Sequence, residues 1–446
     1  MRFSFYNPFL MTPHRIILLS YLVLIAIGTL LLYLPISTYE GISFIDALFT
    51  VTSAVSVTGH VVVDTYKTFT PFGKVVILLL IQIGGLGYMG FTTYFLILLR
   101  RKLSLRDRIL LAESVNYPGL HGLVRFLKRI VPFVVGVELL GALLLLPFFL
   151  RHFDLPTSLA MSIFHSVSAF NNAGFNILPE GLLPFRDSLW LNLVLSLLII
   201  LGGLGFYVIH ELILYRRKEI QRLSTHTKLV LVSTLFLIVG GCLVLLLDTI
   251  RWENYSLKEK LLIAFFHSVS SRTAGFSTVD LKIFSEGGLF FLVVLMFVGT
   301  GPGGTGGGIK ITTAVVIILV VHSYLKGSGQ VVVFGRRIAE DTIQRALTIF
   351  VLSFLYTTFA TLILTHTEEA PLLSTLFETV SAFSSVGLSV GNPQGLSLCA
   401  DWSPFGKVVI IITMLMGRMG IMSFMLALYG KGEESRIKPP EARLLL

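Results

Sequence analysis

The sequence Ile163–Phe175, IFHSVSAFNNAGF, decides the fold because it recurs three more times along the chain. The counterparts are FFHSVSSRTAGF at Phe265–Phe276, LFETVSAFSSVGL at Leu376–Leu388 and LFTVTSAVSVTGH at Leu48–His60. Each copy is a short amphipathic run that ends in small residues and one glycine, which is Gly59, Gly174, Gly275 or Gly387. Such internal similarity indicates a fold built from repeated units.

The composition predicts a protein that crosses a membrane several times. Of the 446 residues, 54% are hydrophobic and 13% are charged, and the mean hydropathy is +0.83. These values exclude an ordinary soluble domain. The first long apolar run, Ile16–Leu34, has no cleavage site of small residues after it, so we interpret it as a span and not as a signal peptide. Cys242 and Cys399 lie far apart and predict neither a disulfide nor a metal framework.

Each recurring run is too short to cross a bilayer, which takes about 20 apolar residues, but each lies between two longer runs. We therefore expect four units of span, short dip and span, with eight crossings in all. The predicted spans lie near 14–35 and 72–99, 124–150 and 187–214, 227–249 and 287–322, and 342–365 and 404–429. The predicted dips are 42–60, 156–175, 257–276 and 371–388, and the units are 1–100, 101–218, 219–326 and 327–446, the last with a C-terminal tail.

The distribution of basic residues predicts the orientation in the membrane. Most of the 35 lysines and arginines fall in the segments between units and in the termini, as at 100–108 and 216–228. The positive-inside rule then places both termini and these linkers in the cytoplasm, and all four dips enter from outside. The same distribution explains the net charge of +10 without nucleic acid as a partner. The acidic residues of the outer loops fit either ordinary solvated loops or a vestibule that concentrates cations.

Physical chemistry limits what the dips can be. Irregular backbone at membrane depth must line a wet cavity or be buried in protein, and four dips from one side can share one cavity. Ser256 with Glu259, Ser43 with Asp46, and Pro371 are typical of helix starts. Glycine permits the positive φ that lets carbonyl groups point inward, and rings of carbonyl oxygens form cation filters. The alternative is that the glycines only make tight turns.

The predicted fold is therefore an all-α membrane protein with eight transmembrane helices and four re-entrant pore helices around a pseudo-fourfold central pore. The predicted filter binds potassium at its carbonyl groups and consists of Ser56, Val57, Thr58, Gly59, Asn171, Asn172, Ala173, Gly174, Arg272, Thr273, Ala274, Gly275, Ser384, Ser385, Val386 and Gly387.

The glycine-rich sequence 299–308, GTGPGGTGGG, is not a phosphate-binding loop, because Ile309 separates Gly308 from Lys310 and no Ser or Thr follows the lysine. It lies in the middle of a span and predicts a break there, either a passive kink or a mobile flap that acts as a gate. Arg418 lies inside the last span, where a charge costs about 2.5–3.5 kcal/mol, so it should face the pore or pair with Glu138 or with loop carbonyls. The predicted gate consists of Gly299, Thr300, Gly301, Gly303, Gly304, Thr305, Gly306, Gly307, Gly308, Lys310 and Arg418.

The histidines of the short helices invite an enzymatic interpretation that we do not favour. His165 and His267 stand beside serines 166, 168, 268 and 270, but the pattern recurs by repeat and no single Ser–His pair stands apart. We expect these side chains to form structural hydrogen bonds. His60 follows the first filter glycine, and an exposed imidazole there would titrate at about pH 6.5 and add positive charge at the outer mouth.

The sequences SVTGH, NNAGF, RTAGF and SSVGL resemble the filters of the Trk/Ktr/HKT superfamily of cation transporters. The sequences IQIGGLGYMGF at 81–91, LGGLGF at 201–206, GTGPGGTGGGIKITT at 299–313 and GRMGIMSF at 417–424 are similar to the same superfamily. The resemblance covers essentially the whole chain. It is closest to the Ktr type, since the extra N-terminal span pair of Trk-type members is not found here. His60 departs from the apolar residue expected at its position, and the glycine-rich loop is richer in glycine than expected.

The resemblance implies potassium uptake across the cytoplasmic membrane, a homodimer embedded in membrane lipid, and a cytoplasmic ring of nucleotide-binding regulatory subunits (KtrA-like). It implies no cofactor in this chain and leaves a requirement for sodium open. Two alternatives are an alternating-access cation carrier, for which a twofold inverted repeat is more typical, and a sodium-selective transporter. Nothing in the sequence favours an enzyme.

Overall fold

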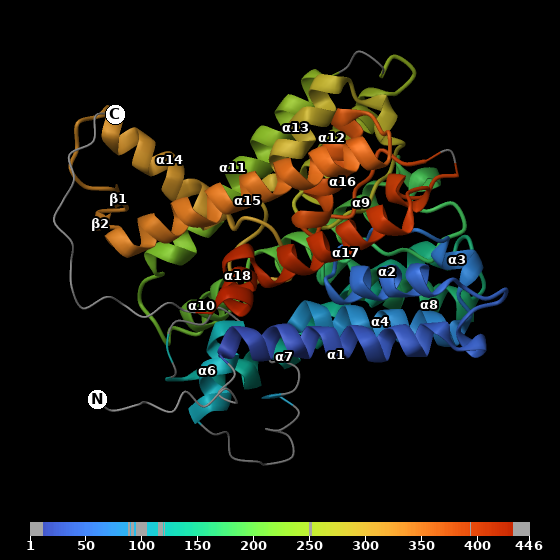
Figure 1. The fold of residues 1–446 in the computed structure, drawn as a ribbon, viewed down its shortest axis with the longest axis horizontal. Helices are drawn as coiled ribbons and strands as arrows, with labels where there is room; N and C mark the ends of the chain where they lie inside the picture. Colours follow the sequence, from blue (N-terminus) through green and yellow to red (C-terminus); the bar gives the residue numbers. More distant parts are fainter. Residues whose placement is uncertain are drawn as a thin grey trace.

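The computed structural model describes residues 12–87, 90, 93–94, 105–114, 119, 121–248, 252–392 and 394–430, and these are almost entirely helical (Figure 1). Four long helices are α1 (Pro13–Tyr33), α7 (Leu123–Phe149), α11 (Thr225–Leu247) and α15 (Glu340–Thr367). Each agrees to within two residues with the first span predicted for its unit, and each is long and apolar enough to cross a membrane.

A short helix follows each long one, where the sequence predicted a dip. These helices are α2 (Phe44–Val55), α8 (Leu155–Phe170), α12 (Leu257–Ser270) and α16 (Leu372–Phe383), and each packs against the long helix before it. Ser256 and Glu259 form the predicted capping box at the start of α12. Ser43 caps α2 through the backbone N–H of Asp46, whereas Pro371 is the N-cap of α16, one residue earlier than predicted.

The second predicted span is bent or interrupted in the second, third and fourth units. In the second unit, α9 (Leu189–Gly203) and α10 (Phe206–Arg216) meet at 97°, and in the fourth, α17 (Pro404–Met419) and α18 (Ile421–Tyr429) meet at 104°. The predicted spans 187–214 and 404–429 therefore each consist of two helices that meet at a sharp bend. Both bends lie at a glycine with positive φ, Gly205 or Gly420, where the helical hydrogen bonding is broken.

The predicted break in the third unit is present between α13 (Glu286–Phe297) and α14 (Ile311–Leu325). In the first unit, α4 (Pro71–Leu86) forms the beginning of the predicted span 72–99, and most of the remainder lies outside the described residues. The described part of the chain contains four helices that can span a membrane, or up to six if each bent pair counts as one. Eight crossings stay a prediction.

Smaller elements complete the described chain. They are the helices α3 (Thr65–Thr68) and α6 (Leu105–Ser114), the 3-10 turns η1 (Pro35–Ser37), η2 (Leu183–Phe185), η3 (Leu281–Ile283) and η4 (Leu398–Ala400), and the strands β1 (Val332–Val333) and β2 (Arg336–Arg337). The two strands form an antiparallel hairpin in which Val332 pairs with Arg337.

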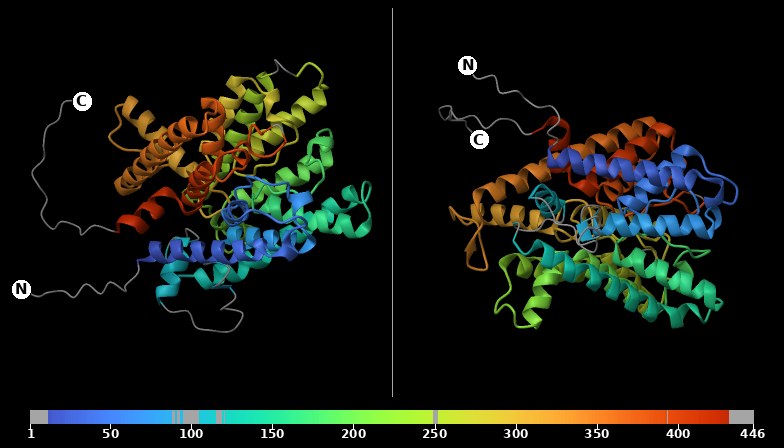
Figure 2. Two further views of the ribbon diagram at one scale, coloured as in Figure 1. Left: turned by 45° about the vertical axis from the view of Figure 1, so that its right-hand side comes forward. Right: turned by 90° about the horizontal axis from the view of Figure 1, so that it is seen from below.

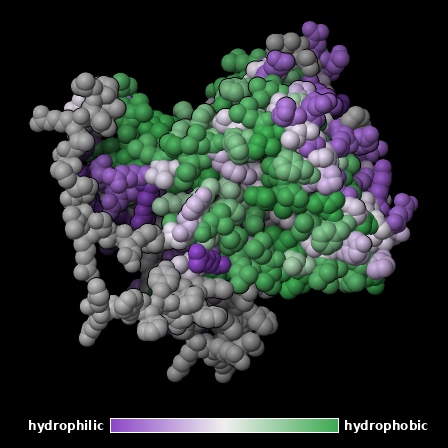
Figure 3. Space-filling view, viewed as in Figure 1, coloured by the Kyte–Doolittle hydropathy of each residue, from purple (hydrophilic) through white to green (hydrophobic). Residues whose placement is uncertain are grey.

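The first and last described helices meet at one end of the bundle, where Arg15 Nε donates to the carbonyl oxygen of Ala427 at 3.0 Å. Figure 1 shows α1 beside α18 at this end and the loops around α2, α3 and α8 at the opposite end, and Figure 2 gives two further directions. The outer faces of the long helices expose large apolar side chains, among them Leu30, Leu139, Phe236 and Phe359. The broad apolar band in Figure 3 fits a surface in contact with lipid.

Small residues allow the second helices to touch the ends of the short helices. Three glycines of these second helices each lie so close to a carbonyl group that a Cβ atom would not fit. The pairs are Gly84 with Val55, Gly202 with Phe170 and Gly417 with Phe383. Those three carbonyls belong to the last residues of α2, α8 and α16. Glycine therefore sets the depth at which each short helix ends inside the bundle, as small residues do at other membrane helix contacts.

We expect Gly202→Ala to destabilise the protein by about 1–3 kcal/mol, because the added methyl group would displace the end of α8. Gly240→Ala is the matched control, since this glycine of α11 has no atom within 4 Å of the position of a Cβ. Thermal unfolding of the purified protein in detergent measures both. Equal melting temperatures for the two variants would contradict the close contact.

Candidate functional site

The four glycine loops that follow the short helices meet in a closed ring. The Cα atom of each glycine lies close to a carbonyl oxygen of the next loop along the chain, and the glycine of the last loop lies close to a carbonyl oxygen of the first. The contacts run from Gly59 to Ala173, from Gly174 to Ala274, from Gly275 to Val386 and from Gly387 to Thr58. Segments more than 300 residues apart in sequence, Thr58 and Gly387, thus become neighbours. The structure brings all four predicted filter segments together at one place.

The backbone of the four loops shares an uncommon conformation. The glycines have φ of 90°, 68°, 76° and 87° in chain order, and the residue two positions earlier also has positive φ. Those earlier residues are Val57, Asn172, Thr273 and Ser385, with φ between 51° and 73°. A left-handed residue that is not glycine costs on the order of 1–3 kcal/mol and persists where its surroundings hold it.

One serine of each short helix holds the loop in this conformation. Ser168 Oγ donates to the carbonyl of Phe175 at 2.7 Å, and Ser270 Oγ donates to that of Phe276 at 2.5 Å. Ser53 Oγ donates to the carbonyl of His60 at 2.9 Å and accepts from Gly59 N at 3.1 Å. Ser381 Oγ accepts from the N–H of Gly387 at 3.0 Å. Each loop is therefore hydrogen-bonded to a serine of its own short helix, although the serine donates in the second and third loops, accepts in the fourth and does both in the first.

The serines and histidines suspected of catalysis form structural hydrogen bonds, as predicted. Ser166 and Ser268 donate to backbone carbonyls of the preceding long helices. The ring atoms Nδ1 of His165 and His267 contact carbonyls one turn earlier in their own helices. His267 Nε2 also contacts Ser277 Oγ at 2.9 Å, and that hydroxyl donates to the carbonyl of Val279. These groups support the loops.

A buried polar network that the sequence did not predict holds the second loop. Asn171 Nδ2 donates to Glu138 Oε1 at 2.9 Å and to Gln82 Oε1 at 3.0 Å, and Gln82 Nε2 donates to Glu138 Oε2 at 3.2 Å. The suggested pairing of Glu138 with Arg418 is therefore wrong. The available signal was an acidic residue in an apolar span, which needs a polar partner, but that signal does not identify the partner.

The interpretation of His60 as an exposed group at the outer mouth is also wrong. Its side chain is fully buried, and Nδ1 lies 3.4 Å from Glu378 Oε1 and 3.3 Å from Ser397 Oγ. Both partners come from the fourth unit. An exposed titrating imidazole therefore cannot account for any pH dependence of ion entry.

The glycine-rich loop 299–308 lies against the ring. A Cβ on Gly306 would meet Thr273, and Cβ atoms on Gly307 and Gly308 would meet Ser385 and Ser384. The loop begins and ends at a short parallel bridge between Val298 and Ile309. It is thus directly adjacent to the third and fourth filter segments.

Backbone hydrogen bonds fix this loop to the second and fourth units. Gly301 N donates to the carbonyl of Gly203 at 2.9 Å, and Thr305 N donates to that of Gly202 at 3.2 Å. Phe206 N donates back to the carbonyl of Gly303 at 3.0 Å. In this structure the loop is therefore held by hydrogen bonds to neighbouring backbone.

Arg418 connects the glycine-rich loop to the first unit. Its guanidinium donates to the carbonyl of Thr305 in the loop and to the carbonyls of Gly84 and Gly85 at the end of α4. Lys310 Nζ donates to the carbonyl of Gly306 at 2.5 Å. Of the two partners suggested by the sequence, the loop carbonyls are therefore correct.

A cavity of about 790 Å³ is lined by residues of this loop and by none of the four ring glycines. Its lining includes Gly306, Gly308, Lys310 and Arg418, and it extends to Pro13 at the start of α1. Arg418 thus faces a cavity as well as the loop. The loop therefore contacts the ring and also lines the cavity. The ring offers uncharged oxygen atoms suited to coordinating a cation that sheds its water.

The chain resembles known cation transport proteins over nearly its whole length. The profile of the TrkH family, described as cation transport protein, matches residues 4–435. The chain is 38% identical over 439 residues to Ktr system potassium uptake protein B of Bacillus subtilis, covering 97% of this chain and 96% of that one. It is 36% identical over 447 residues to the potassium/sodium uptake protein NtpJ of Enterococcus hirae, covering 98% and 97%.

A solved structure has the same fold. The potassium transporter TrkH from Vibrio parahaemolyticus superposes with a TM-score of 0.74 at 20% sequence identity, covering 96% of this chain and 86% of that one.

Proposed function

Because the chain belongs to the TrkH family of cation transport proteins and is not an enzyme, we propose that it takes up potassium through a channel-like pore whose filter is the ring of four glycine loops. The closed ring is the observation that supports this most strongly, since each loop offers carbonyl groups and each contacts the next. The ring contains no carboxylate, which fits a site for a weakly held monovalent cation. The names of the relatives support potassium as the cation.

We propose that loop 299–308 and Arg418 form the barrier to flow in the resting state. Two observations support this role: the loop contacts the ring and also lines the cavity, and Arg418 holds the loop to the end of α4. A segment fixed by a limited set of hydrogen bonds can exchange between two states that differ by a few kcal/mol. The positive charge of Arg418 also opposes a cation that has passed the ring.

We further propose four units over 1–100, 101–218, 219–326 and 327–446, cytoplasmic termini, a homodimer and a cytoplasmic nucleotide-binding partner. The recurrence of a long helix followed by a short helix supports the units. The basic linkers support the orientation. The name of the Bacillus subtilis relative speaks of a Ktr system, which supports a partner subunit.

Sodium is the second candidate substrate or co-substrate, because the Enterococcus hirae relative is named as a potassium/sodium uptake protein. Expression in cells that lack their own potassium uptake, with and without a regulatory subunit, tests the proposal. Growth at limiting potassium, dependent on this chain, is the expected result. Uptake of sodium without potassium would favour the second candidate.

Gly59→Ser should reduce the preference for potassium over sodium by about tenfold, which corresponds to about 1.4 kcal/mol. A side chain there would press on Ala173 and separate the first two loops of the ring. Gly41→Ser is the matched control, because Gly41 has nearly the same φ, 87° against 90°, but open space around it. Relative uptake of the two ions measures the effect, and equal ratios in both variants would exclude Gly59 from the filter.

Arg418→Gln, or removal of several glycines from loop 299–308, should raise the maximal rate of potassium uptake by roughly tenfold, as expected if about 1.4 kcal/mol is taken from the barrier. The apparent affinity should change less in Arg418→Gln, since the hydrogen bonds of Arg418 go to loop 299–308 and to the end of α4 and not to the ring. Arg345→Gln is the control, because Arg345 lines the same cavity without a hydrogen bond to the loop among the described residues. Unchanged flux in both gate variants would place the barrier elsewhere.

Regulation by nucleotide should require a separate cytoplasmic protein, since the glycine-rich sequence lacks the lysine and hydroxyl spacing of a phosphate-binding loop. Flux through the purified chain in liposomes should therefore not respond to ATP or ADP until a regulatory subunit is added. A response of the chain alone would contradict the assignment.

A further inference from the structure

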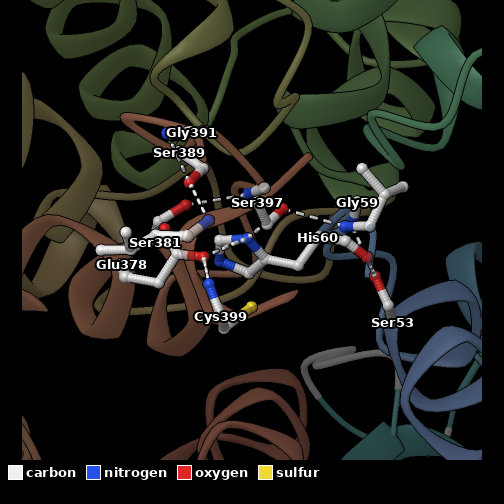
Figure 4. Close-up of polar contacts among 12 residues, drawn as sticks. Ser53, Gly59, His60, Glu378, Ser381, Ser389, Gly391, Ser397 and Cys399 are labelled. Carbon is white, nitrogen blue, oxygen red and sulfur yellow. Dashed lines mark hydrogen bonds and ion pairs between the residues drawn. The ribbon is translucent and has the colours of Figure 1, made fainter. Parts of the chain in front are cut away.

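Three side chains of the types that bind transition metals converge beside the ring. His60 comes from the first glycine loop, Glu378 from α16 and Cys399 from η4, and Figure 4 shows them pointing toward one another. One ligand atom from each lies within 4.8 Å of the other two, and all three residues are fully buried. Among the described residues, this is the one cluster of three or more His, Cys, Asp or Glu side chains with this spacing.

Two atoms of this cluster have no hydrogen-bond partner among the described residues. They are His60 Nε2 and Glu378 Oε2, each fully enclosed by protein. The other carboxylate oxygen, Oε1, accepts from the backbone N–H of Cys399 at 3.2 Å and lies 3.4 Å from His60 Nδ1. A buried polar atom left without a partner costs about 1–3 kcal/mol, and more if it is charged. The cluster is therefore incompletely satisfied by protein alone.

The spacing fits a single small ion. Zinc binds imidazole nitrogen and carboxylate oxygen at about 2.0–2.2 Å and thiolate sulfur at about 2.3 Å, so tetrahedral ligand atoms stand roughly 3.5 Å apart. His60 Nδ1 and Glu378 Oε1 lie 3.4 Å apart, close to that separation, and a ligand atom of each of the three residues lies within 4.8 Å of the other two. Thiolate and imidazole are soft or borderline ligands that favour zinc over calcium or magnesium. The same ligand set does not suit potassium, which prefers uncharged oxygen.

We propose that His60, Glu378 and Cys399 bind one thiophilic divalent ion of the zinc class. On binding, the Cys399 thiol loses its proton to solvent and its sulfur bonds the metal, while His60 binds as the neutral imidazole. Three protein ligands leave a fourth position, beside which Ser397 Oγ lies at 3.3 Å from His60 Nδ1. The oxidation state of the metal does not change.

The position of the cluster explains what the ion would do. Gly59 and Gly387 lie side by side where the first and last loops of the ring meet, and this junction joins segments that no short connection links. Ser397 N donates to the carbonyl of Val61 at 3.0 Å, so the loop that carries Cys399 already contacts the first loop. A metal bound by His60, Glu378 and Cys399 would join the first and fourth units at this junction and stabilise the ring there.

The chain holds two cysteines, which gives a direct test. The full-length Cys242→Ser protein, purified in detergent and stripped with a chelator, retains Cys399 as its single thiol. Titration with cobalt(II) should produce a thiolate-to-cobalt charge-transfer band in the near ultraviolet, at one ion per chain. Zinc should displace the cobalt and raise the melting temperature.

Cys399→Ser and His60→Gln complete the experiment. Cys399→Ser should lose the band, and His60→Gln should weaken cobalt binding at least tenfold while keeping the sulfur contribution. If Cys399→Ser does not fold, the Cys242→Ser protein alone decides the question. No band in folded Cys242→Ser protein, or a melting temperature that zinc does not raise, would overturn the proposal, and the three side chains would then form only a hydrogen-bonded contact.

Discussion

Backbone polar groups at membrane depth must find partners within the protein, and the centre of this molecule is organised by that requirement. The four glycine loops leave helical geometry inside the bundle, so each is held by a serine of its own short helix. The backbone of the glycine-rich loop is likewise hydrogen-bonded within the protein, to the backbone of Gly202, Gly203 and Phe206. Where glycines such as Gly202 let helix ends approach closely, the carbonyl groups of the ring are brought to a common depth. Irregular backbone is concentrated where these supports exist.

The long and short helices could be predicted from sequence because their signals are local. Apolar length predicts α1, α7, α11 and α15, and the residues that begin helices predict α2 and α12. The ring itself could be anticipated because four copies of one pattern imply four equivalent positions. The bends at Gly205 and Gly420 could not, since a glycine inside an apolar run fits helix packing as well as a break.

The environment of single polar side chains was beyond the sequence. His60 was expected to be exposed, but its partner Ser397 lies 337 positions away and buries it. Glu138 was one of the partners suggested for Arg418, but Asn171 and Gln82 hydrogen-bond its carboxylate. Arg418 instead donates to backbone carbonyls of Thr305 and Gly84. Every residue has a backbone carbonyl, so the residue types in the sequence do not identify these partners. In each case the partner is set by how units pack together, and that information is not local.

The order of contacts in the ring has a consequence for biosynthesis. Three of the four contacts join loops that follow one another along the chain, but the contact between Gly387 and Thr58 joins the last loop to the first. A ribosome makes the fourth loop after the other three. The ring therefore closes only once the fourth loop has been made, and a chain that is terminated before that loop has three loops and an open side. Such fragments lack a complete ring of carbonyl groups. They are incompletely packed bundles with exposed loop backbone, which the proteins of membrane quality control can recognise.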